Sequence, residues 1–106
     1  RDNERLEFLG DTLLDVVVSD ILLERYPESN EGQLSRLRAS MVNEKTLGEI
    51  ALGVGIDRVL LLGKGEEITG GREKLSILSG TLEAVIAAIY LDGGFAAIFP
   101  IVRHLF

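Results

Sequence analysis

Three acidic residues near the start of the chain are spaced like successive turns on one face of an α-helix. Glu7 follows Glu4 by three positions and Asp11 follows Glu7 by four, so a helix would set their carboxylates in a row. Like charges at this spacing destabilise an isolated helix. The row therefore requires a cationic partner, and a divalent metal ion would satisfy all three carboxylates.

A solvated acidic face is the alternative, because acidic residues near the start of a helix interact favourably with its dipole. The other residues of the segment are mostly apolar: Leu6, Phe8, Leu9, Leu13 and Leu14. A helix that is apolar nearly all round is usually buried, and buried carboxylates need partners. The neighbouring residues thus favour the metal interpretation.

Another acid, Glu83, stands in a long apolar segment, residues 75–91, in which we expect the following side chains to be buried: Leu78, Leu82, Val85, Ile86 and Ile89. Burying an unpaired carboxylate among Leu, Val, Ala and Ile costs several kcal/mol. We therefore expect Glu83 to face either the acidic row or solvent.

The string NERLEFLGD at residues 3–11, followed by an apolar helix, resembles the signature of the ribonuclease III family of double-stranded-RNA endonucleases. Residues 76–84, SILSGTLEA, resemble the family's second acidic motif, in which an aspartate, two further residues and a glutamate stand in an apolar frame. Glu31-Gly32, residues 34–39 and residues 90–94 also agree with the family pattern. The resemblance covers essentially the whole chain.

This resemblance implies that Glu7, Asp11 and Glu83 are direct metal ligands, and that Asp11 and Glu83 are catalytic. Glu4 and Glu31 match two further catalytic acids that help to assemble the cleavage site, one of them contributed across a dimer. Carboxylate oxygens suit Mg²⁺, with Mn²⁺ as a possible substitute. Such a metal ion lowers the pKa of a bound water and stabilises the leaving 3′-oxygen of a phosphodiester.

Gly80 departs from the family pattern, because it occupies the place of the first aspartate of the second motif. Glycine offers no oxygen ligand and is about 1 kcal/mol less favourable than alanine in a helix, so reduced or lost activity is expected. Three interpretations are open: a degenerate domain without activity, a deliberate inactivating substitution, or a natural variant in which another residue or water replaces the ligand.

Several basic residues could contact RNA phosphates, or could instead form surface ion pairs with nearby acids: Arg36, Arg38, Arg72 and Lys74. Phe8 matches a family aromatic residue that packs across the dimer interface, and ordinary core packing is the alternative for it.

Composition limits the class of protein. The formal net charge of −6 disfavours nonspecific binding to phosphates, unless the acids are concentrated in a metal-loaded cleft. The absence of Cys excludes disulfides and thiolate metal sites and agrees with a cytoplasmic location. The only His, His104, is expected near a helix C-terminus rather than in a catalytic site. An apolar content of 46% without an uncharged apolar run of about eighteen residues predicts burial in an oligomer, not a membrane span.

We predict an all-α fold with two long core helices, similar to a ribonuclease III endonuclease domain. The predicted helices cover residues 2–26, 31–42, 44–52, 75–91 and 95–106, with a short helical turn over Asp57–Leu62 and a loop over Gly63–Gly71. Pro27 should stop the first helix, Asn30 should cap the second and Asn43 should break it. Gly53 and Gly55 should end the third helix, and Gly93-Gly94 the fourth.

The resemblance implies a homodimeric, Mg²⁺-dependent endonuclease that hydrolyses double-stranded RNA in RNA processing. The alternatives are a catalytically inactive dimeric scaffold, a double-stranded-RNA-binding module, and a metal-free helical interaction module. We expect a single domain, residues 1–106, that lacks the family's first helix and carries no double-stranded-RNA-binding domain.

Overall fold

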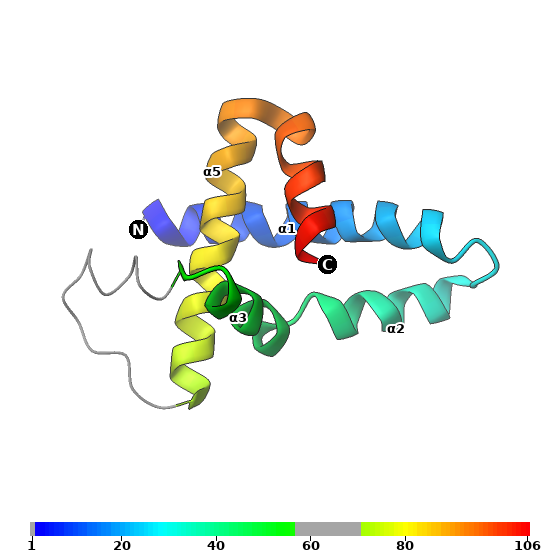
Figure 1. Ribbon diagram of the computed structural model, residues 1–106, viewed down its shortest axis with the longest axis horizontal. Helices are drawn as coiled ribbons and strands as arrows, with labels where there is room; N and C mark the ends of the chain where they lie inside the picture. The colour runs from blue at the N-terminus through cyan, green and yellow to red at the C-terminus, as the bar shows by residue number, and fades with distance from the viewer. Residues whose placement is uncertain (1, 57–70) are drawn as a thin grey trace.

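The computed structural model describes residues 2–56 and 71–106, and in these residues the chain forms helices and no strand. The helices are α1 (Asp2–Arg25), α2 (Glu31–Met41), α3 (Glu44–Gly53) and α5 (Gly71–Leu105). Helix α1 follows the long axis of the molecule, α2 returns beneath it, and the first arm of α5 crosses it (Figure 1). The predicted all-α fold with two long core helices is confirmed.

Side-chain caps set the starts of the two short helices. The Asn30 side chain accepts a hydrogen bond from the Gln33 backbone N–H at 2.9 Å, and the Gln33 side chain accepts one from the Asn30 N–H at 2.8 Å. This reciprocal pair is a capping box. Asn43 Oδ1 accepts from the Thr46 N–H at 2.8 Å, so Asn43 both ends α2 and begins α3.

Helix α5 consists of two helical arms that meet at Gly94. Gly94 has a non-helical backbone, with φ of 70° and ψ of −168°, and the second arm ends at Leu105. The prediction of two helices separated at Gly93-Gly94 is confirmed. Residues other than glycine rarely adopt this backbone conformation. The bend folds the second arm back beside the first (Figure 1). Helix α5 begins at Gly71, which was predicted to lie in a loop. The predictions for Asp57–Leu62 and for residues 63–70 lie outside the described residues.

The hydrophobic core lies between α1, α3 and both arms of α5. Its fully buried side chains include Leu14, Val17, Ile21, Leu22, Leu47, Leu78, Ile86, Ile98 and Val102. Residues Lys74–Leu105 are long and apolar enough to cross a membrane by length and composition alone. In this fold, however, the segment is bent at Gly94 and supplies core side chains from both arms.

Val85 was predicted to be buried, and this prediction is wrong because the side chain is 40% exposed. Ile77 lies two turns before Val85 and is also exposed, as is Ala88, which lies one turn after it. These residues form the outward side of α5, whereas the side that carries Leu82 and Ile86 enters the core.

Gly10 of α1 lies directly against the backbone of Glu83 in α5. A Cβ atom at residue 10 would lie 2.5 Å from the carbonyl carbon and 2.9 Å from the Cα of Glu83, closer than real Cβ atoms come. Gly48 of α3 makes a similar contact, since its Cβ would lie 2.9 Å from the carbonyl oxygen of Leu75. These glycines let α1 and α3 touch the backbone of α5 and fix its position.

Substitution of Gly10 by alanine should destabilise the protein. Backbone atoms cannot move aside as a flexible side chain does, so we expect a loss of about 1–3 kcal/mol or more in the free energy of unfolding, measured by urea denaturation. Gly53→Ala is the control, because a methyl group there would have no described atom within 4 Å. A Gly10→Ala variant as stable as the natural chain would contradict the backbone contact.

Candidate metal centre

A cavity of about 290 Å³ lies where α1, α3 and α5 meet. Its lining is mostly polar and comprises Glu7, Asp11, Val42, Asn43, Glu44, Leu47, Ser76, Ser79, Gly80 and Glu83. The cavity therefore brings together Glu7 and Asp11 of α1 with Glu83 of α5. Of the two positions expected for Glu83, facing the acidic row or facing solvent, the structure shows the first.

The environment of Glu83 strongly favours its protonated form. Burial raises the pKa of this half-buried carboxyl group from its ordinary value of 4.5 to about 8. A side-chain hydrogen bond with Asp11 and the negative charges of Asp11, Glu7 and Asp15 raise the pKa further in the same direction. The cavity thus concentrates more negative charge than it can hold without a proton or a cation.

The carboxylate of Glu7 rests against the backbone of Gly80. A Cβ atom at residue 80 would lie 2.8 Å from Cδ and Oε1 of Glu7 and 2.9 Å from Oε2. The Glu7 carboxylate therefore fills the space in which a side chain at position 80 would begin.

Within residues 2–56 and 71–106, no three His, Asp or Glu side chains are already arranged as a metal-binding group. Glu83 is hydrogen-bonded to Asp11, so these two carboxylates face each other rather than a common ion. The donors are carboxylates with nearby serine hydroxyls, which fit Mg²⁺ or Mn²⁺; metal binding stays a prediction.

Neither Glu4 nor Glu31 is among the residues that line the acidic cavity. Glu4 lines a groove with Phe8 and Leu91. Glu31, at the start of α2, lines a separate groove of about 340 Å³ between α1 and α2. Within one chain, therefore, neither residue joins Glu7, Asp11 and Glu83 around the cavity.

Sequence reasoning missed four polar residues that line the acidic cavity: Asn43, Glu44, Ser76 and Ser79. Ser76 and Ser79 stand one turn apart on α5, and Glu83 follows Ser79 by four positions. This helical spacing was a usable signal. Glu44 is the first residue of α3 and reaches the cavity because the Asn43 cap starts the helix there; this placement required the tertiary structure.

The basic residues proposed for RNA contact are dispersed. Arg38 donates a hydrogen bond to Ser19 Oγ at 2.8 Å, and its Nε lies 4.0 Å from Asp15, so it ties α2 to α1. Arg36 lines an exposed groove beside the α1–α2 turn, and Lys74 is half-buried near the start of α5. The side chain of Arg72 lies outside the described part of the chain.

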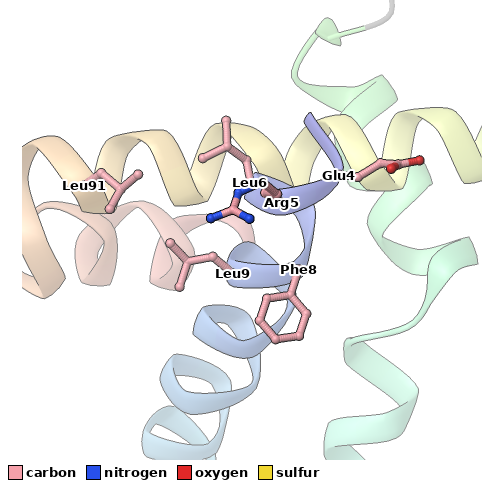
Figure 2. Close-up of a pocket in the computed structure, with 6 residues that line it drawn as sticks. All are labelled: Glu4, Arg5, Leu6, Phe8, Leu9 and Leu91. Atoms are coloured by element: carbon pink, nitrogen blue, oxygen red, sulfur yellow. The ribbon is translucent and has the colours of Figure 1, made fainter. Parts of the chain in front are cut away.

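Phe8 lies at the surface rather than in the core of its own chain. Its side chain is 77% exposed, and with Leu6, Leu9 and Leu91 it lines a groove of about 600 Å³. In Figure 2 the Glu4 carboxylate points away from Leu9 and Leu91, and the Arg5 guanidinium is drawn between Leu6 and Leu9, so the groove combines apolar side chains with a cationic group. An exposed apolar patch of this kind is typical of an interaction surface.

The whole chain, residues 1–106, matches the family described as Ribonuclease-III-like. The chain belongs to the ribonuclease III family. It is 54% identical to Ribonuclease 3 of Syntrophobacter fumaroxidans over 106 residues, which are 100% of this chain and 44% of that protein. It is 53% identical to Ribonuclease 3 of Geobacter metallireducens over 106 residues, which are 43% of that protein. The chain thus spans less than half the length of these curated relatives.

Two solved structures of the nuclease domain of ribonuclease III from Campylobacter jejuni are similar to this chain. Both are 44% identical to it and cover 97% of it, with TM-scores of 0.81 and 0.79, over 72% and 70% of their own chains. The first is described for structural flexibility in a region involved in dimer formation of that nuclease domain. These similarities confirm the ribonuclease III resemblance and the all-α fold.

The stability of the metal-free domain should fall as pH rises. Because the pKa of Glu83 is about 8 in the folded state and 4.5 ordinarily, the folded state binds more protons than the unfolded state between these values. The stabilisation is complete below pH 4.5 and is lost as pH rises through about 8. Thermal melts across this range should show the decline, and Glu83→Gln should flatten it. A natural chain that becomes more stable from pH 6 to pH 8 would contradict this assignment.

Proposed function

We propose that this domain cleaves double-stranded RNA as a homodimer, with Mg²⁺ or Mn²⁺ held by Glu7, Asp11 and Glu83. The observation that carries the proposal is the convergence of these carboxylates, from α1 and α5, on one cavity. The raised pKa of Glu83 supports it, since the crowded charge would be relieved by a divalent cation. Similarity to proteins named Ribonuclease 3 supports RNA as the substrate.

The residues that line the cavity have different roles in the proposed reaction. Glu7, Asp11 and Glu83 would hold the cation; of these, Asp11 is exposed and Glu83 is half-buried. When bound, a divalent cation supplies the charge that activates water and stabilises the negative charge on the leaving 3′-oxygen. Ser76 and Ser79 add hydroxyl groups that can orient water or phosphate oxygens by hydrogen bonding.

Two copies of the chain complete the proposed assembly. The groove with Phe8 and Leu91 offers an exposed apolar surface for pairing. Glu31 is separated from the cavity of its own chain, so it would act on the cavity of a second copy. Two cavities in one dimer would cut both strands of a duplex, which is recognised by its A-form shape and its 2′-hydroxyl and phosphate groups.

A non-cleaving dimeric scaffold is the second candidate, and Gly80 is the observation that favours it. Position 80 supplies no oxygen, and the described carboxylates are not arranged as a metal-binding group. Fold and interface surface are independent of that missing carboxylate, so a scaffold function would survive its loss.

Cleavage assays distinguish the two candidates. We expect the natural chain to cut a labelled RNA duplex with Mg²⁺ but not with EDTA, and Glu83→Gln to lower the rate by about 100-fold or more. Cleavage by a Gly80→Asp variant alone would support the scaffold instead. Failure of both the natural chain and Gly80→Asp to cut would count against the metal-site assignment.

Substitution of Phe8 by aspartate should separate the dimer. The change removes an apolar side chain that is 77% exposed and places a carboxylate at the interface, so we expect sedimentation as a monomer with unchanged helical circular dichroism. Tyr26→Asp is the matched control, because Tyr26 is 40% exposed just beyond the opposite end of α1. Dimers of equal stability in both variants would exclude the Phe8 surface as the interface.

A further inference from the structure

We propose, on the basis of the metal-dependent function proposed above, that the Glu7 carboxylate takes over the position of the carboxylate that residue 80 lacks. Glycine at position 80 is then a requirement for placing Glu7. Helix α1, through Glu7, thereby supplies a carboxylate beside the backbone of α5, where residue 80 has none.

The contact between Glu7 and Gly80 involves the entire carboxylate group. Both oxygens and Cδ of Glu7 lie within 2.8 to 2.9 Å of the point where a Cβ at residue 80 would stand. Even a methyl group there would push the Glu7 carboxylate away. Because the neighbour is the end of a flexible side chain, Glu7 would move without disturbing the backbone.

The crossing of α1 and α5 explains why these two residues meet. Gly10 contacts the backbone of Glu83, and the residues three positions earlier on the two helices are Glu7 and Gly80. The helices therefore meet at two successive turns. In one turn the Glu7 side chain contacts the backbone of Gly80, and in the next turn the backbone of Gly10 contacts the backbone of Glu83.

Electrostatic repulsion also favours one carboxylate, rather than two, beside the backbone of residue 80. Glu7, Asp11, Glu44 and Glu83 already line the cavity, and an aspartate at position 80 would add another negative charge beside them. It would also displace Glu7 from the α5 backbone. An aspartate at position 80, as in the family pattern, should therefore replace the Glu7 carboxylate rather than add a further ligand.

Direct Mn²⁺ binding, followed by electron paramagnetic resonance, tests this relation in the absence of RNA. Gly80→Ala adds a methyl group and no charge, yet we expect it to weaken Mn²⁺ binding about tenfold, as much as Glu7→Gln does. The Gly80→Ala/Glu7→Gln double variant should bind no more weakly than Glu7→Gln alone. Gly53→Ala, the control for a glycine-to-alanine change in a helix, should bind Mn²⁺ as the natural chain does.

Circular dichroism and thermal melts of each variant verify folding. If Gly80→Ala fails to fold, Glu7→Asp replaces it, because a side chain one methylene shorter keeps its charge but withdraws from Gly80; we expect the same tenfold weakening. Unchanged Mn²⁺ affinity in Gly80→Ala or in Glu7→Asp, with weaker binding in Glu7→Gln, would overturn this inference and leave the proposed function intact. Absence of Mn²⁺ binding by the natural chain would overturn both.

Discussion

The backbone contact between Gly10 and Glu83 is the constraint on which the rest of this domain depends. It brings α1 and α5 closer than any residue with a Cβ at position 10 would allow. Residues on either side of the contact are thereby held opposite one another: Glu7 against Gly80, and Asp11 in hydrogen-bonding range of Glu83. A close helix crossing thus determines where the acidic cavity forms.

The core and the cavity lie on neighbouring sides of the same crossing. Leu14, Val17 and Ile21 continue along α1 into the core, where they meet Leu82 and Ile86 of α5. Burial of these side chains supplies the free energy that holds the helices together. Burial of Glu83 raises its pKa, and the neighbouring carboxylates that this free energy holds in place despite their repulsion raise it further.

Much of the fold could be predicted from local sequence signals. Pro27 and the two asparagine caps placed the ends of α1, α2 and α3 to within a residue or two, because turn and cap chemistry acts over a few positions. The glycine pair Gly93-Gly94 likewise placed the break between the two arms of α5. The exposure of Val85 was not predictable in this way, because the buried side of α5 depends on the packing of distant segments.

The candidate site, like the fold, could be predicted only in part from local sequence signals. Spacing placed Glu7 and Asp11 on one side of α1, and the cost of burying Glu83 predicted that it would face either them or solvent. The role of Gly10 was not visible in the sequence, since a glycine within a helix does not reveal which backbone it touches. The position of Glu7 on Gly80 was equally hidden, because it results from the relative placement of two helices.

Helix α2 is held differently from the other helices. None of residues 31–41, all of which the structure describes, is fully buried, and a hydrogen bond and an ion pair of Arg38 join the helix to α1. Segments with little buried apolar surface open at a lower free energy than the core. Amide hydrogens of α2, the helix that carries Glu31, will therefore exchange with solvent through local opening, ahead of those in α1.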